Sequence, residues 1–211
     1  MYRIFAAIVL VAVLGSAACG GGGNGGPTPT ETFPPDFTPQ PPGLLTPSPP
    51  PPVDGDSPLV LYDQSALPYS VSLPNGWTVE PGAQIDKFSY STADKGLVAQ
   101  LSVTCSKTLR GNAGDPTSLV EEDVTILRET RAPVIAGTVT ELQIDGLKTL
   151  RWPYSVNFGP SSTYQWVYYI GDKDCTWRVR TVVFGTSPGE GWEQLFNRIA
   201  GSFHSKIERA G

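Results

Sequence analysis

The 211-residue chain has little of what most catalytic and metal sites are built from. It contains one histidine, His204, and three cysteines, and only 17% of its residues are charged. Histidine is the usual general base and the commonest metal ligand, and zinc sites need cysteine and histidine at short spacings. Motifs for nucleophiles or for phosphate binding are also missing. We therefore expect no metal, no cofactor and no catalytic residues, and thus not an enzyme.

Clusters of positive charge are missing as well. The formal net charge is −5, and lysine and arginine are spread along the chain without a run. Proteins that bind nucleic acid concentrate positive charge against the phosphates, and basic patches attach proteins to anionic membranes. The sequence therefore excludes a nucleic acid partner and an electrostatic attachment to a membrane.

No apolar run is long enough to span a bilayer, which takes about twenty residues. The longest run, Ile4–Leu14, has eleven, the length of a signal-peptide core. Residues 1–18 are therefore predicted to be a signal peptide. Ser16-Ala17-Ala18-Cys19 resembles a bacterial lipobox, which implies a lipid on Cys19 and an extracytoplasmic protein anchored to the cell membrane. The alternative is ordinary cleavage at the same bond, which would secrete the protein.

The cysteine count fits an oxidising compartment. If Cys19 carries lipid, Cys105 and Cys175 remain as a pair, and an even remainder outside the cytoplasm indicates a disulfide. The alternative is two unrelated buried thiols.

Residues 19–58 lack the composition of a folded segment. A glycine-rich run, residues 20–26, is followed by thirteen of the twenty-one prolines between Pro27 and Pro58. Proline cannot donate to a hydrogen-bond ladder, so this segment is predicted to be a disordered, partly polyproline-II tether. The alternative is a ligand for a proline-reading domain.

Residues 59–207 suffice for a single domain with one core. Alternating apolar positions and turn residues predict strands over 69–73, 77–79, 85–91, 97–105, 139–144, 147–158, 162–171 and 175–185. Asp145-Gly146 marks the strongest hairpin. One helix is predicted to begin at Asp115-Pro116, and a second to be capped by Ser187.

Two stretches resemble the PsbP-like superfamily. YSVSLPNGWTVEPG, residues 69–82, resembles its opening hairpin, and GWEQLFNRIAGSFHS, residues 191–205, resembles its closing helix. The superfamily includes extrinsic photosystem proteins, Ran-binding Mog-type proteins and bacterial lipoproteins of the LpqN type, and the N-terminus here favours the lipoprotein branch. The resemblance implies an α+β fold, an antiparallel β-sheet flanked by helices in an α/β/α sandwich, and a non-catalytic binding module.

Aromatic residues alternate along two neighbouring predicted strands, and alternate residues share one face of a sheet. If the strands pair, the rings could line an apolar groove for a small ligand or a partner protein. The alternative is core packing. The candidate surface comprises Trp152, Tyr154, Tyr164, Trp166 and Tyr168, with Phe158 beside it and Arg151, Arg178 and Arg180 as candidates for an anionic headgroup.

Two further charged features are interpreted as structural. The acidic run Glu121–Asp123 is expected to be solvated near a helix N-terminus, and His204 to lie at a helix C-terminus. Two functions remain open: a tethered module that binds an apolar small ligand or an envelope protein, and a scaffold subunit of an envelope complex without a ligand pocket.

Overall fold

The computed structural model describes residues 53–94, 96–107, 114–129, 133–158 and 162–208. The predicted signal peptide, Cys19 and most of the predicted tether lie outside these residues. Within the described ranges, no helix is long and apolar enough to cross a membrane. The elements are β1 (Leu59–Tyr62), β2 (Tyr69–Pro74), β3 (Thr78–Glu80), β4 (Ile85–Thr92), β5 (Gly96–Lys107), α1 (Thr117–Glu129), β6 (Val134–Ala136), β7 (Thr140–Ile144), β8 (Leu147–Asn157), β9 (Ser162–Gly171), β10 (Cys175–Gly185), α2 (Trp192–Gly201) and β11 (His204–Ser205).

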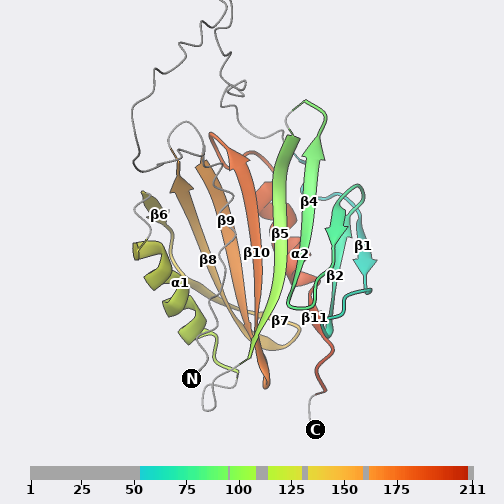
Figure 1. Cartoon of the computed structure of the whole chain (residues 1–211), viewed down its shortest axis with the longest axis vertical. Helices are drawn as coiled ribbons and strands as arrows, with labels where there is room; N and C mark the ends of the chain where they lie inside the picture. The colour runs from blue at the N-terminus through green and yellow to red at the C-terminus, as the bar shows by residue number, and fades with distance from the viewer. Residues whose placement is uncertain (1–52, 95, 108–113, 130–132, 159–161, 209–211) are drawn as a thin grey trace, which may run out of the picture. The chain divides into compact units, whose positions relative to one another are not determined.

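The strands form two antiparallel sheets (Figure 1). The large sheet has the order β3-β4-β5-β10-β9-β8-β6, with β7 also paired to β8. The small sheet has the order β1-β2-β11, so it joins the beginning and the end of the folded region. The long central strands β5, β10, β9 and β8 are consecutive neighbours in the large sheet and give it its length.

The two helices lie on opposite faces of the large sheet, with α1 in front and α2 behind in Figure 1. One apolar cluster joins the inner face of α2 and the small sheet to β5, β9 and β10. A second cluster joins α1 to the opposite side chains of β8 and β9. The predicted antiparallel sheet flanked by helices is therefore confirmed.

Aromatic rings fill the larger cluster. Tyr69 stacks on Phe203 with ring centroids 5.6 Å apart and contacts Trp177 at 5.5 Å. Trp192 and Phe196 of α2 lie 5.5 Å apart, and all five side chains are at most 2% exposed. Burial of large rings is the dominant stabilising contribution in such a core.

The predicted hairpins with tight turns are confirmed. β7 and β8 meet at Asp145 and Gly146, which have φ values of 53° and 74°, the left-handed pair that a type I′ turn requires. β9 and β10 pair along their whole length. Cys105 and Cys175 form the predicted disulfide, with Cα atoms 5.7 Å apart on the neighbouring strands β5 and β10.

Three local expectations are wrong. β2 and β3 do not form a hairpin, because β2 pairs with β1 and β11 while β3 pairs with β4 in the other sheet. The second helix begins at Trp192 with Gly191 as its N-cap rather than at Ser187. His204 lies in β11, beyond the end of the helix, with Nδ1 at 2.9 Å from Oδ1 of Asp145.

Candidate interaction site

The pairing of β8 with β9 shows whether the predicted aromatic residues share one face of the sheet. Trp152 lies opposite Val167, and Trp166 lies opposite Pro153. Directly opposed residues point to the same face, so an even-numbered residue of β8 shares its face with odd-numbered residues of β9. The two aromatic series therefore point to opposite faces, and the shared surface does not form.

The rings instead belong to the two cores. Trp152 and Tyr154 are packed in the cluster beneath α1, and Trp166 and Tyr168 in the cluster beneath α2. Each of these four is at most 6% exposed, and only Tyr164 is half-buried. The core-packing alternative describes them better than the ligand-surface interpretation does.

Two of these aromatic residues, one half-buried and one buried, reach the floor of a surface groove. Tyr164 and Trp166 line an open apolar groove of about 200 Å³ on the α2 face of the sheet, together with Ile135, Gly137, Pro153 and Pro188 among others. Most of the residues that line the groove belong to β8, β9 and the edge strand β6. Ile135 is 74% exposed there, more than any other large hydrophobic side chain among the described residues.

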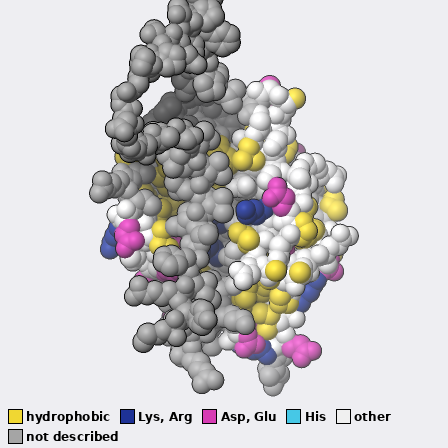
Figure 2. Space-filling view, viewed as in Figure 1, with side chains coloured by type: hydrophobic (Ala, Val, Ile, Leu, Met, Phe, Trp, Pro, Cys, Tyr) yellow, Lys and Arg dark blue, Asp and Glu magenta, His cyan; other side chains and the backbone are white. Residues whose placement is uncertain are grey.

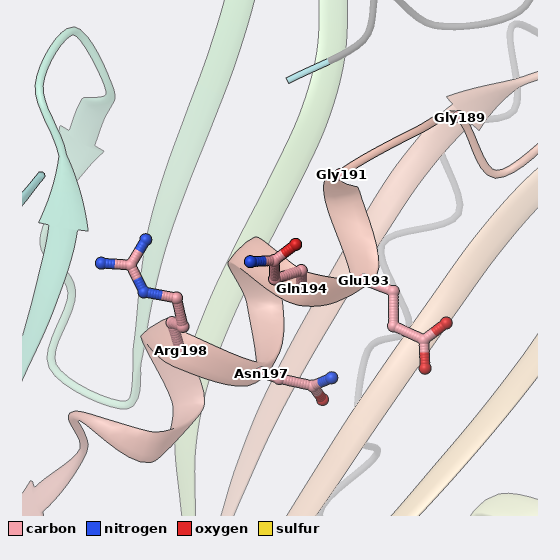
Figure 3. Close-up of a pocket in the computed structure, with 6 residues that line it drawn as sticks. All are labelled: Gly189, Gly191, Glu193, Gln194, Asn197 and Arg198. Atoms are coloured by element: carbon pink, nitrogen blue, oxygen red, sulfur yellow. The ribbon is translucent and has the colours of Figure 1, made fainter. Parts of the chain in front are cut away.

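A second, larger hollow of about 700 Å³ follows the outer side of α2 (Figure 3). Helical periodicity buries Trp192, Leu195, Phe196, Ile199 and Ala200 and leaves the intervening polar residues outside. The hollow is lined by Gly189, Gly191, Glu193, Gln194, Asn197 and Arg198. Pro188 lines the groove and Gly189 lines the hollow, so the two are neighbours. We call them together the α2 site.

Polar contacts hold the sheet side of the α2 site in place. Glu193 and Asn197 point to one side of the helix in Figure 3. Glu193 forms an ion pair with Arg151 of β8, and Oδ1 of Asn197 accepts a 2.6 Å hydrogen bond from the Tyr168 hydroxyl. Burial raises the pKa of Tyr168 to about 12, so this hydroxyl stays protonated and donates at neutral pH.

The other side of α2 is bound by the segment that precedes β1. Arg198 donates to the carbonyl oxygens of Gly55 and Ser57, and Gln194 donates to Asp56 at 2.9 Å. The Val53 amide donates to the carbonyl of Glu190 at 3.1 Å. We call residues 53–57 the strap.

The strap explains why a glycine begins α2. Gly191 has a φ of 78°, and a Cβ atom there would lie 1.8 Å from the Val53 carbonyl oxygen. Only glycine tolerates both the left-handed backbone and the close approach. The helix start that the sequence places at Ser187 lies instead at Trp192, next to this contact.

The acidic run on α1 is only partly solvated, contrary to expectation. Asp123 is 3% exposed, and its two carboxylate oxygens contact Arg178 at 2.9 Å and Arg180 at 3.1 Å. The Tyr169 hydroxyl donates to it at 2.7 Å, and burial followed by the Asp123 charge raises the pKa of Tyr169. Arg178 and Arg180 therefore hold α1 on the sheet rather than face a headgroup.

Charges on the visible surface are mixed. In Figure 2, lysine and arginine lie beside aspartate and glutamate on the described surface turned to the viewer. Within the residues that the structure describes, no group of three or more histidine, cysteine, aspartate or glutamate side chains could hold a metal ion.

The comparisons with known proteins find similarity in structure alone. No family model and no curated protein sequence matches the chain. The crystal structure of the Ran-binding protein Mog1p from Saccharomyces cerevisiae has a TM-score of 0.54 and 12% identity, and the match covers 71% of this chain and 96% of Mog1p.

Two further structures match less closely by TM-score. Cyanobacterial PsbP from Synechocystis sp. PCC 6803 has a TM-score of 0.49 and 18% identity, covering 70% of this chain and 92% of its own. A protein from Bacteroides thetaiotaomicron has a TM-score of 0.48 and 9% identity over 70% of this chain. The match covers 48% of that protein, so this chain spans about half its length.

The likeness to Mog1p shows that the two proteins share a fold. The resemblance drawn from the two end motifs is therefore confirmed at the level of the fold, although the first motif spans two sheets rather than one hairpin. Of the α2 site, only Tyr154, Tyr164 and Trp166 of the groove were predicted from the sequence. The hollow was not predicted, because its polar side chains have the ordinary pattern of a solvated helix face. Ile135 lies in the short stretch Val134–Ala136, which the sequence did not predict to be a strand.

Proposed function

We propose that this protein is an extracytoplasmic lipoprotein whose folded domain binds an envelope protein through the α2 site, without catalysis. The observation that carries the proposal is the pairing of an open apolar groove with a polar rim. Protein interfaces combine an apolar centre with charged and amide side chains around it. Here Ile135 and Trp166 supply the centre, and Glu193 and Asn197 lie on the neighbouring rim.

A protein partner is favoured over an apolar small ligand. Pockets that enclose small molecules hold roughly 300–1,000 Å³ and bury most of the ligand. The apolar groove has about 200 Å³. The larger hollow is open and runs along glycines and polar side chains at the start and outer side of α2, so it does not enclose a ligand. The same fold in Mog1p belongs to a Ran-binding protein, which agrees with a protein partner for this fold.

The proposed extracytoplasmic location rests on the N-terminal sequence together with the disulfide. A disulfide persists in an oxidising compartment, and Cys105 and Cys175 are bonded in the structure. In this proposal a lipid on Cys19 attaches the chain to the outer side of the bacterial membrane, and the proline-rich tether lets the domain reach its partner.

Site-specific photocrosslinking in intact cells tests the partner. A photoreactive amino acid at exposed Ile135 is expected to give a discrete protein adduct, whereas the same amino acid at exposed Ser91 of β4 serves as the control. A lipid-sized adduct at position 135, or equal protein adducts at both positions, would contradict the proposal.

Replacing the lipidation site tests the proposed membrane anchor independently of the protein partner. We expect Cys19→Ser to move the protein from the membrane fraction to the soluble fraction, because the proposed anchor is a lipid on that sulfur. Labelled palmitate should be incorporated into the unchanged chain and not into the variant. A variant that stays with the membranes would overturn the anchor without affecting the α2 site.

A further inference from the structure

Within the part of the chain that the structure describes, the edge strand β6 carries backbone groups with no strand beside them. In the large sheet, β6 is paired on one side only, with β8. The Asn157 amide donates to the Pro133 carbonyl at 2.9 Å, and the Gly137 amide donates to the Pro153 carbonyl at 2.8 Å. These two bonds fix which residues of β6 face β8.

Antiparallel pairing alternates between hydrogen-bonded and non-hydrogen-bonded residues. With residues 133 and 137 facing β8, Ile135 is the hydrogen-bonded residue between them, opposite Ser155. The amide and carbonyl groups of Val134 and Ala136 therefore point away from β8, out of the sheet edge. An additional antiparallel strand could form hydrogen bonds with these two outward-pointing residues, which alternate along the edge.

The side chain of Ile135 lies on the same face as the groove. It lines the groove with Pro153 and Trp166, and it is 74% exposed. Val134 points to the other face, where it packs partly against the cluster beneath α1. The edge thus presents backbone donors and acceptors beside an apolar hollow.

We infer that the partner docks by adding an extended segment of its chain to β6. This inference rests on the proposed function and names the chemistry of the partner at the groove end of the α2 site. In antiparallel addition, two partner residues would form hydrogen-bonded pairs with Val134 and Ala136, and the residue between them would lie opposite Ile135. That central residue shares the face of Ile135, so it is apolar and enters the groove.

The edge of β1 is less suited to this role. β1 exposes Val60 and Leu61 at 52% and 63%, yet neither the groove nor the hollow is lined by a residue of β1. Backbone hydrogen bonds give affinity in strand addition, while pockets for alternate side chains give specificity. Of these two edges, β6 is the one that lies beside the groove.

The test uses the full-length chain and a display library of random twelve-residue peptides as the probe. Selected peptides are expected to slow the hydrogen exchange of the Val134 and Ala136 amides and to carry an apolar residue whose replacement by aspartate abolishes binding.

Ala136→Pro removes an outward amide that β8 does not use, and proline is tolerated at such edge positions. We expect it to weaken peptide binding by about tenfold or more.

Ala136→Ser is the matched control, because it keeps the amide and should leave the affinity within about twofold. Peptides that bind the α2 site without protecting the two amides would overturn strand addition and leave the proposed function standing. Selection of no peptide that binds the α2 site would count against both. The exchange measurement on the unchanged chain decides the case even if Ala136→Pro does not fold.

Discussion

At the scale of single residues, Asp123 is a buried carboxylate that three partners share. It lies on α1, is 3% exposed, and is the common partner of Arg178, Arg180 and Tyr169. Removing one member of a buried charge cluster leaves the others uncompensated, which costs more than the intact contact contributes. The polar contacts between α1 and the sheet therefore converge on one carboxylate, beside the apolar cluster that packs the same helix.

We expect Asp123→Asn to lower the free energy of unfolding by about 3 kcal/mol, because two arginines lose their counter-charge. Glu122→Gln is the matched control, since Glu122 is exposed on the same helix and should change stability by less than about 0.5 kcal/mol. Urea denaturation of both variants measures the difference. Equal stability of the two variants would contradict the role of the Asp123 ion pairs in holding α1 on the sheet.

The identity of Asp123 as a buried group could not be predicted from the sequence. Three acidic residues in a row near a helix start have the composition of a solvated face, and the helix period alone does not say how far the buried stripe extends. The arginines that neutralise Asp123 lie more than fifty residues later, on β10. Only the packing of α1 on the sheet brings these groups together.

At the scale of elements, the start of α2 is fixed from outside the helix. The strap approaches Gly191 so closely that a Cβ atom would meet the Val53 carbonyl oxygen at 1.8 Å. At the other end, Gly201 is the last residue of the helix and has nothing within 4 Å of a Cβ position. The same substitution can therefore be compared at a crowded and at an open glycine of one helix.

Gly191→Ala is expected to destabilise the protein by about 2 kcal/mol or more, because it forces a left-handed alanine and displaces the strap. Gly201→Ala should be neutral or slightly stabilising. Thermal denaturation compares the two, and hydrogen exchange should show loss of protection at the Val53 amide in Gly191→Ala only. Equal melting temperatures would contradict the role of the strap.

Elements with local turn chemistry could be predicted, and the pairing of distant elements could not. Asp145-Gly146 specifies its hairpin within two residues, and the strands β7 to β10 follow the predicted boundaries closely. Pro74-Asn75-Gly76 also specifies a turn, but the sheet that each flanking strand joins depends on partners such as β11 and β4. The offset between β8 and β9 is likewise set by pairing, and one residue of register moves a whole aromatic series to the other face.

At the scale of the whole molecule, the disulfide covalently closes a long loop of the domain. Cys105 and Cys175 are seventy positions apart, and the loop between them contains α1 and strands β6 to β9. A crosslink over such a span removes many conformations from the unfolded chain. Most of the α1 side of the sheet therefore lies within one covalently closed segment.

We expect the double variant Cys105→Ser, Cys175→Ser to lose about 4 kcal/mol of unfolding free energy, because the unfolded chain regains the entropy of an open loop. Reduction of the unchanged protein should give a similar loss in urea denaturation. A thiol assay on the denatured, unreduced protein should find neither cysteine free. Two reactive thiols would contradict the disulfide. An unchanged urea midpoint after reduction would contradict its stabilising effect.

The strap also decides where a recombinant fragment of this protein should begin. By strand pattern alone the domain starts at Leu59, and a fragment cut there would keep every strand of both sheets. It would nevertheless lose the carbonyl groups that receive Arg198 and the segment that covers Gly191. The shortest version that preserves the described surroundings of α2 starts at Val53, and any binding assay on a shorter one would measure a different surface.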